Sequence, residues 1–395
     1  MVSKKNKELH VDKEALSTLS LIKEGLLHPL DKIMSEKEAR IVCDTEIFNG
    51  KHFPMSFTFA PNGKKNQENI KNAKKGEKFD LIVDGEKRGE IVADEVFKVN
   101  QFERIDKFFG NADSSAYVTN QILKRLGKYA ICGDYEVDCN DIKNIKNKIK
   151  NAITKRDAKT VSAVMLKANP FHRAHERLLR ITLEKSDLLV IFLIKSHDKE
   201  NVLPFELRLK TLEYFVEHYL HKDKIIIVPF DSTFIFADQK NAVLDAIVAK
   251  NLGCNKIVFG EFYNALGIYY DNNQMKTALD EYDARINADI ISSFVYCNEC
   301  KTLVNDKTCP HGAHHHIKYN SKSILALIKS GILPPAILMR KDISAILLSH
   351  LFPNRFENFK HVYFDLFPGT GLVESHSDRD FYLELMKLYQ TTSLT

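Results

Sequence analysis

Apolar runs alternate with amphipathic stretches along the second half of the chain, from Val161 onward. Short runs rich in Val, Ile and Leu are typical of buried strands, and apolar residues recurring every three or four positions are typical of helices. The pattern predicts strands at 161–166, 188–194, 224–229, 256–260 and 290–296. Between them it predicts helices at 175–185, 205–220 and 241–251. Strands that alternate with helices favour a parallel sheet with right-handed crossovers.

The first part of the chain follows a different pattern. Short candidate strands at 79–84 and 88–93 are separated by turn-forming pieces, which predicts a β-rich domain. A helix is predicted over 16–25, ended by its final glycine. The Lys- and Asn-rich stretch 62–76 has no interleaved aromatic residue, so we interpret it as a solvated loop without a function. The polar stretch 141–159 fits a connecting helix or linker.

The turn between the strand at 161–166 and the next helix is Asn169-Pro170. Asn is a favoured N-cap and Pro suits the first helical position, so the helix is predicted to begin at this turn. His172 and His175 are three apart, which places both imidazoles on one face of a first turn that we expect to be partly exposed. Beside the positive end of the helix dipole they would form an anion site with two proton donors. Alternatively, they are ordinary surface or core histidines.

Composition narrows the class of protein. A chain of 395 residues can hold two or three domains with their own cores. Lys and Arg number 57 against 52 for Asp and Glu, which permits an anionic substrate but does not call for nucleic acid. No stretch approaches a transmembrane run and the N-terminus lacks the apolar core of a signal peptide. We therefore expect a cytoplasmic protein without a membrane partner.

Three of the seven cysteines are clustered, which is unlike the dispersed set of a secreted disulfide protein. Cys297, Cys300, Cys309 and His311 follow C-x2-C-x8-C-x-H spacing, which suits a tetrahedral structural zinc site. Another histidine could complete the set instead, with His314 the strongest candidate. The alternative is that these are reduced, buried cysteines.

The piece Asn169-Pro-Phe-His-Arg-Ala-His175 closely resembles the N-P-x-H-x-x-H signature of the ATP sulfurylase (sulfate adenylyltransferase) family, within the H-x-x-H nucleotidyltransferases. Other pieces also resemble family segments, and the resemblance spans most of residues 15–347. These pieces lie at 26–34, 108–113, 129–138, 204–212, 237–260 and 323–347. It implies an α/β fold that begins with a β-rich, PUA-like N-terminal domain over 1–150. A Rossmann-like, parallel-sheet nucleotidyltransferase domain over 151–318 would follow, with a zinc loop at 296–316. A small C-terminal subdomain and tail would occupy 319–395.

The resemblance also implies an activity, the transfer of AMP from Mg-ATP to sulfate with release of pyrophosphate, and a homo-oligomer, expected to be a dimer. Its catalytic residues would be His172, His175 and Asn169, with both histidines on the phosphates. The residues implied to bind nucleotide and anions are Lys167, Ala168, Pro170, Arg208, Lys240 and Gly260.

Several positions depart from the family pattern. The sulfate-binding Q-T-R-N run is here Leu166-Lys-Ala-Asn169, so most donors that would fix the acceptor are absent. The G-R-D-H-A-G loop becomes 260–265, with Phe262 and Tyr263, and S-G-T-x-x-R becomes 320–325. Two alternatives follow: a nucleotidyltransferase for another acceptor, or a non-catalytic nucleotide-binding or assembly protein. No G-x-x-x-x-G-K-[ST] motif occurs, so a fused adenylyl-sulfate kinase is not expected.

Overall fold

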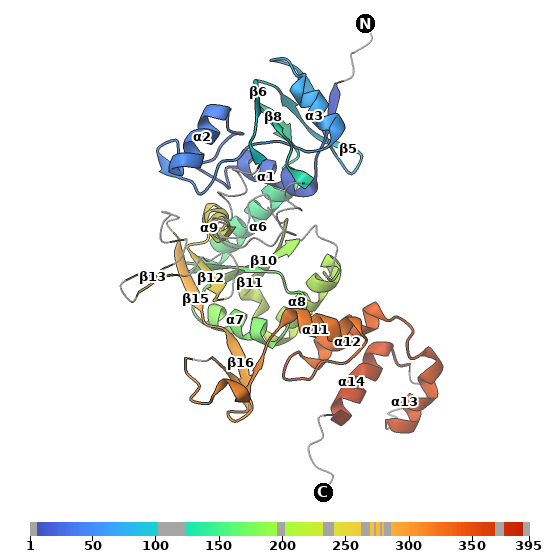
Figure 1. Ribbon diagram of the computed structural model, residues 1–395. Helices are drawn as coiled ribbons and strands as arrows, with labels where there is room; N and C mark the ends of the chain where they lie inside the picture. Colours follow the sequence, from blue (N-terminus) through green and yellow to red (C-terminus); the bar gives the residue numbers. More distant parts are fainter. Residues whose placement is uncertain are drawn as a thin grey trace. The chain divides into compact units, whose positions relative to one another are not determined.

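The computed structural model describes residues 6–101, 124–195, 202–231, 241–261, 269–271, 274–276, 279, 286–305, 307–367 and 375–389. The chain divides into two compact units. The first contains Met1–Met165 and Val228–Ile290, and the second contains Leu166–Ile227 and Ile291–Thr395. Figure 1 shows the elements coloured along the sequence.

The first unit begins with a four-stranded sheet of order β1-β4-β5-β8. Its strands are β1 (Lys7–His10), β4 (Lys78–Val83), β5 (Glu86–Val92) and β8 (Tyr135–Val137). Alternate residues of β4 are buried, as expected of a strand with one face on a core. The predicted β-rich start of the chain is therefore confirmed. Two pairs of short strands accompany this sheet, β2 (Ile47–Phe48) with β3 (Lys51–His52) and β6 (Glu95–Lys98) with β7 (Tyr129–Cys132).

The helices of this part are α1 (Lys13–Lys23), α2 (Glu36–Thr45), α3 (Lys64–Lys71) and α6 (Asn140–Arg156). Gly25, with φ +71°, follows α1, as predicted for its end. The connecting helix expected at 141–159 is present as α6. Lys146 of α6 lies 3.1 Å from the carboxylate of Glu24, which joins α6 to the end of α1.

The expectation of a solvated loop at 62–76 is wrong, because α3 occupies its centre. Ile70 is fully buried, and the side chain of Asn66 is only 4% exposed. The Asn66 amide accepts from the N–H of His10 at 2.8 Å and donates to the carbonyl of His10 at 2.6 Å. These contacts with a strand far away in the sequence stabilise a helix that its polar composition does not indicate.

The largest sheet is a five-stranded parallel sheet with the order β11-β10-β9-β12-β15. Its strands are β9 (Val161–Leu166), β10 (Leu188–Lys195), β11 (Ile225–Asp231), β12 (Lys256–Gly260) and β15 (Asn287–Ile291). Every residue of β9 is buried, as in a sheet covered on both faces. Helix α9 (Asn241–Asn251) precedes β12. The bounds predicted for β9, β12 and α9 are confirmed. Separately, β13 (Tyr269–Asp271) pairs with β14 (Gln274–Lys276).

The single strand predicted at 290–296 is wrong. Residues 287–291 form β15, whereas β16 (Phe294–Cys297) belongs to a separate three-stranded sheet. Ser292 and Ser293 interrupt the apolar run, and after them the chain pairs with β17 (Thr302–Asn305) and β18 (His316–Lys318) instead. Figure 1 shows this small sheet projecting beyond α7 (Arg173–Glu184) within the second unit.

The remaining helices of the second unit are α8 (Phe205–Tyr219), α11 (Ser321–Lys329), α12 (Lys341–Leu351), α13 (Lys360–Leu366) and α14 (Asp378–Tyr389). Short 3-10 helices lie at Lys222–Lys224, Ala313–His315 and Glu357–Phe359. Helix α12 packs against both α8 and α14. The tail after residue 348, which the sequence left without a role, therefore supplies a helix that covers α12.

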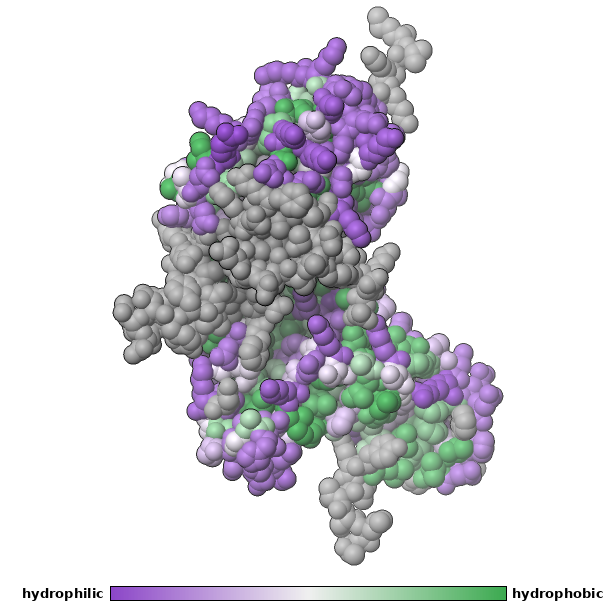
Figure 2. Space-filling model, in the orientation of Figure 1, coloured by the Kyte–Doolittle hydropathy of each residue, from purple (hydrophilic) through white to green (hydrophobic). Residues whose placement is uncertain are grey.

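The C-terminal helices also carry exposed apolar side chains, which Figure 2 shows gathered on their surface. Phe364 is 55% exposed, Leu366 52% and Leu388 49%. Among the described residues, no helix has both the length and the apolar character needed to cross a membrane.

Candidate nucleotide site and metal centre

The turn after β9 leads into the predicted site. Ala168 is 1% exposed and has φ +49°, and the Asn169–Pro170 peptide bond is cis. Helix α7 begins at Arg173 with His172 as its N-cap, so the prediction that Asn169 caps the helix and Pro170 opens it is wrong. The Asn169 side-chain oxygen accepts instead from the N–H of Leu203, at 2.9 Å, just before α8. The Asn169 side chain therefore makes a long-range hydrogen bond and does not cap α7.

His172 and His175 form a stacked pair, as their spacing predicts. Their ring centroids are 3.8 Å apart and the ring planes differ by 20°. The backbone N–H of His172 donates to Nδ1 of His175 at 3.3 Å. Because Nδ1 accepts this bond, a neutral His175 carries its proton on Nε2.

The first turn is less open than the sequence suggested. His172 is only 4% exposed, which corrects the expectation of partial exposure, while His175 is partly buried. Nε2 of His172 lies 2.9 Å from Oγ of Ser321. Nδ1 of His172 is buried and has no hydrogen-bond partner among the described residues. A buried polar atom without a hydrogen-bond partner lowers the stability of the fold. Such an atom is expected in a site where a ligand supplies the missing partner.

Burial holds both imidazoles neutral near pH 7. It lowers the pKa of His175 to about 4. Burial, and to a smaller extent the neighbouring His175, also lowers the pKa of His172 well below its ordinary value. Each ring can therefore offer one N–H donor to an anion, and a bound polyanion would raise both pKa values.

Arg208 lies beneath the strand ends and is 2% exposed. Its Nε donates to the carbonyl of Leu203 at 3.1 Å, and its Nη1 donates to the carbonyls of Lys167 at 2.6 Å and Ile194 at 3.0 Å. Among the described residues no carboxylate forms an ion pair with it, and burial lowers its pKa. The guanidinium joins three backbone segments and leaves a positive charge near the ends of two strands.

Lys195 is a candidate that the sequence analysis missed. It is the last residue of β10, and its Nζ lies 4.9 Å from the centroid of the Phe205 ring. Because Arg208 bonds to the carbonyls of both Lys167 and Ile194, the ends of β9 and β10 lie side by side. Ligands bind at the carboxyl ends of parallel strands, so the position of Lys195 at such an end was the available signal.

Other predicted residues take different places. Pro170, two residues before His172, is buried. Lys167, the residue after β9, is exposed. Gly260 ends β12, and a Cβ added there would meet no described atom within 4 Å. Lys240, Phe262 and Tyr263 lie outside the described residues, as does the family-like piece at 108–113.

An ion-pair network fixes the first turn of α7. Glu176, 5% exposed, lies 3.2 Å from Arg173 and 2.9 Å from Arg340. The N–H of Arg173 donates to the carbonyl of Leu338 at 3.0 Å. The guanidinium of Arg340 stacks 3.9 Å from the centroid of the Tyr219 ring, on α8. These contacts bind α7, α8 and the start of α12 into one frame around the histidine pair.

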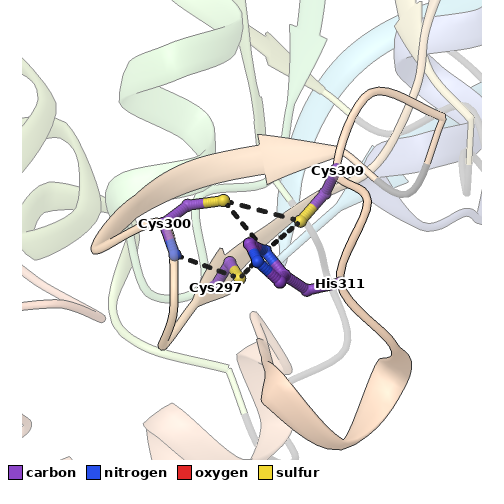
Figure 3. Close-up of side chains that lie close together, drawn as sticks. All are labelled: Cys297, Cys300, Cys309 and His311. Carbon is purple, nitrogen blue, oxygen red and sulfur yellow. Dashed lines mark hydrogen bonds between the residues drawn. The ribbon is translucent and has the colours of Figure 1, made fainter.

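The predicted metal ligands come together at the small sheet. The potential ligand atoms of Cys297, Cys300, Cys309 and His311 all lie within 4.8 Å of one another. Figure 3 shows the four side chains close together. Nδ1 of His311 is 3.5, 3.3 and 3.6 Å from the three sulfur atoms in that order. The sulfur atoms of Cys300 and Cys309 are 3.7 Å apart. His314, the alternative ligand, is not part of this group.

These spacings fit a tetrahedral zinc ion. Sulfur at about 2.3 Å and nitrogen at about 2.0–2.1 Å from such an ion would lie about 3.8 Å (S–S) and 3.5 Å (S–N) apart. Backbone N–H groups of Cys300 and Glu299 oppose the effect of burial on Cys297, and its pKa falls to about 6. A second imidazole, Nε2 of His316, lies 3.3 Å from Cys309 Sγ, as an outer partner of a ligand would.

Comparisons with known proteins agree with this architecture. A family model described as ATP-sulfurylase matches residues 140–350, and one described as a PUA-like domain matches residues 2–139. The sulfate adenylyltransferase of Halothermothrix orenii is 23% identical, over 86% of this chain and 90% of that protein. That of Carboxydothermus hydrogenoformans is 26% identical, over 67% of this chain and 71% of that protein.

A solved structure, a hexameric APS kinase from Thiobacillus denitrificans, has a TM-score of 0.65 and 15% identity. The match covers 88% of this chain and 63% of that longer chain, and it shows the fold alone. A PUA-like N-terminal domain followed by a parallel-sheet nucleotide-binding domain is thereby confirmed. Because the first family model covers more than half of the sequence, the chain belongs to the ATP-sulfurylase family.

Proposed function

We propose that this protein transfers AMP from Mg-ATP to a small oxyanion, with sulfate as the acceptor and pyrophosphate as the second product. The observation that carries the proposal is the stacked His172–His175 pair at the start of α7, with one buried ring nitrogen that lacks a partner. Its family relatives named sulfate adenylyltransferases support the choice of reaction.

In this reaction an acceptor oxygen attacks the α-phosphorus of ATP and pyrophosphate leaves, so catalysis depends on positioning and on stabilising negative charge. The neutral His172 and His175 rings would donate N–H groups to phosphate oxygens at the helix mouth. Negative charge that builds up there raises the pKa values of both imidazoles and so favours their protonated form, which donates stronger, charge-assisted hydrogen bonds. The unpaired charge of Arg208 adds a positive potential beneath the strand ends. Magnesium, when bound with ATP, would neutralise part of the phosphate charge.

The acceptor side differs from the family pattern in a way that the structure makes specific. Leu166 is 4% exposed and Ala168 1%, so the positions of the family Gln and Arg are small or apolar and closed off. Among the described residues, Lys167 and Lys195 are cations at the ends of β9 and β10. A lysine holds an anion as a point charge without the fixed fork of arginine. We therefore propose that sulfate turnover is slower than in enzymes with an intact Q-T-R-N run, or that a larger or less charged acceptor is preferred.

The test measures pyrophosphate release from Mg-ATP with sulfate, other oxyanions and phosphorylated acceptors. Turnover should depend on one of these acceptors and should fall at least about a hundredfold in His175→Ala. His172→Asn is the better partner variant, because Ala at the buried His172 would leave a cavity. Wild-type protein that neither binds ATP nor releases pyrophosphate with any acceptor would refute the proposal.

We further propose that Cys297, Cys300, Cys309 and His311 bind one structural zinc ion, as their tetrahedral spacing supports. None of the seven cysteines forms a disulfide bond, which agrees with a reducing compartment such as the cytoplasm. We also propose self-association, with the dimer as the first state to test by light scattering. The solved structure with the similar fold is described as hexameric.

A further inference from the structure

Ser321 touches the histidine pair although nothing in the family pattern assigns it a role. It is the first residue of α11, beside α7 in the second unit (Figure 1), and its Oγ lies 2.9 Å from Nε2 of His172. Asn320 already caps α11, because its side chain accepts from the N–H groups of Lys322 and Ser323. The Ser321 hydroxyl is therefore not needed to cap its own helix.

The direction of this hydrogen bond decides what His172 can bind. A neutral imidazole has one N–H donor and one lone-pair acceptor, and a serine hydroxyl can donate or accept. If Nε2 carried the proton, the buried Nδ1 would present a lone pair, which phosphate oxygens would repel. If Ser321 donates to Nε2, the proton lies on Nδ1, and Nδ1 is the buried atom that lacks a partner.

We propose that Ser321 is a positioning residue that donates its hydroxyl hydrogen to Nε2 of His172 and so holds the Nδ1–H tautomer ready for a phosphate oxygen of a nucleoside triphosphate. The choice of ligand rests on the proposed function. The family run S-G-T-x-x-R has glycine where this chain has Ser321. The hydroxyl is thus a feature of this chain, and it reaches a histidine that the family motif supplies.

The neighbouring contacts keep His172 from turning to another orientation. Its ring stacks on the ring of His175. Its ring centroid also lies 5.7 Å from that of Tyr319, and these two rings are nearly parallel. The Tyr319 hydroxyl donates to the carbonyl of Ile337 at 2.7 Å, so that ring is itself fixed. Within this stack the hydroxyl of Ser321 is the contact able to choose between the two tautomers.

The experiment compares full-length wild type with Ser321→Ala, Ser321→Thr and Ser323→Ala. Nitrogen-15 spectra of the histidine rings identify the protonated nitrogen of His172, assigned with His172→Asn. ATP affinity is measured by calorimetry on the same samples. Ser323→Ala is the matched control, because Ser323 is exposed in the same turn of α11.

Wild type and Ser321→Thr should show a proton on Nδ1 and none on Nε2. Ser321→Ala should show a mixture of both tautomers and bind ATP about threefold to tenfold more weakly, the range for a neutral hydrogen bond. Ser323→Ala should match wild type. A proton on Nε2 in wild type, or an unchanged tautomer in Ser321→Ala, would overturn the proposal. The spectra need no ATP, so a failure of the proposed function would show separately, as absent ATP binding in wild type.

Discussion

The metal cluster and the histidine pair are both sites of a few polar side chains, yet they are completed in different ways. The four cluster residues lie within 297–311 and their ligand atoms converge on one another. The histidine pair reaches its hydroxyl partner 149 positions away in the sequence, at Ser321. One site is assembled by a short segment and the other by the packing of α7 against the C-terminal helices.

The difference extends to what each site lacks. In the cluster, every ligand atom faces other ligands at the spacing that a single ion would occupy, so the metal itself would supply folding energy. In the histidine pair, one buried nitrogen has no partner among the described residues, and the surrounding protein holds it there. On the two proposals, an ion that stays would complete the structural site, whereas the rest of the fold would keep the substrate site incomplete until a ligand binds.

The largest expected effect is on the cluster. Cys300→Ser should abolish near-stoichiometric zinc binding, because structural zinc contributes about 10–16 kcal/mol in small zinc domains and three remaining ligands do not close the shell. Metal analysis of untagged, reduced protein gives the answer directly. Cys43→Ser, which removes a thiol from α2, is the control and should retain the metal. Metal-free wild type would contradict the assignment.

The second effect concerns the frame under the histidines. Arg208→Met should lower the free energy of unfolding by about 3–5 kcal/mol, because two buried carbonyl groups and one partly buried carbonyl group lose their donor. The exposed Arg180, which donates to the carbonyl of Tyr219, offers a matched control. Arg180→Met should cost less than about 1 kcal/mol. Equal losses in urea unfolding of the two variants would show that Arg208 does not anchor the strand ends.

The third effect is a pH dependence. The pKa of His175 is lowered to about 4 in the folded protein, so between its ordinary value and about 4 the unfolded chain binds more protons. The free energy of unfolding should therefore fall as the pH falls through this window, by on the order of 3 kcal/mol in full. Comparing urea unfolding at about pH 7 and about pH 5 measures the part lost over that interval.

The matched variant for this pH effect is His175→Gln, in which the loss should shrink. Subtracting the pH dependence of the variant from that of wild type also removes the opposite contribution of Glu14. Burial raises the pKa of Glu14 to about 7, although Arg125 acts to lower it. Identical pH dependence in wild type and His175→Gln would mean that His175 does not control the acid behaviour.

The same comparison explains what the sequence could predict. Cysteine spacing, alternating apolar runs and the histidine spacing are local patterns, and the cluster, β9, β12, α9 and the stacked pair all agree with them. The start of α7 could not be predicted, because Asn169 bonds to Leu203 across the fold and leaves the cap to His172. Helix α3 was missed for the same reason, since the amide of Asn66 is held by β1.

The predicted role of Arg208 shows a further limit. A basic residue in a family-like helix suggests an anion contact, but its Nε and Nη1 here bind backbone carbonyls. Lys195 was missed because a lysine at the end of an apolar run looks like an ordinary strand terminus. The strand order and the bonds from Arg208 place this lysine next to the end of β9, which Lys167 follows. The carboxyl ends of parallel strands are where ligands commonly bind.

The smallest expected effect tests whether these two lysines replace the Gln and Arg side chains that would bind the acceptor oxyanion in the family pattern. Lys195→Gln should lower kcat/KM for the preferred oxyanion by up to about tenfold, and the exposed Lys167→Gln by about threefold, because solvent screens the more exposed charge. Both losses should shrink at high salt, whereas loss of a fixed hydrogen bond would persist.

The control is Lys185→Gln, because Lys185 is an exposed cation at the opposite end of α7, and this change should leave kcat/KM unchanged. If Lys195→Gln behaves like this control while Lys167→Gln does not, only the end of β9 holds the acceptor. The histidine site would then, like the cluster, depend on one short segment for its anion contacts.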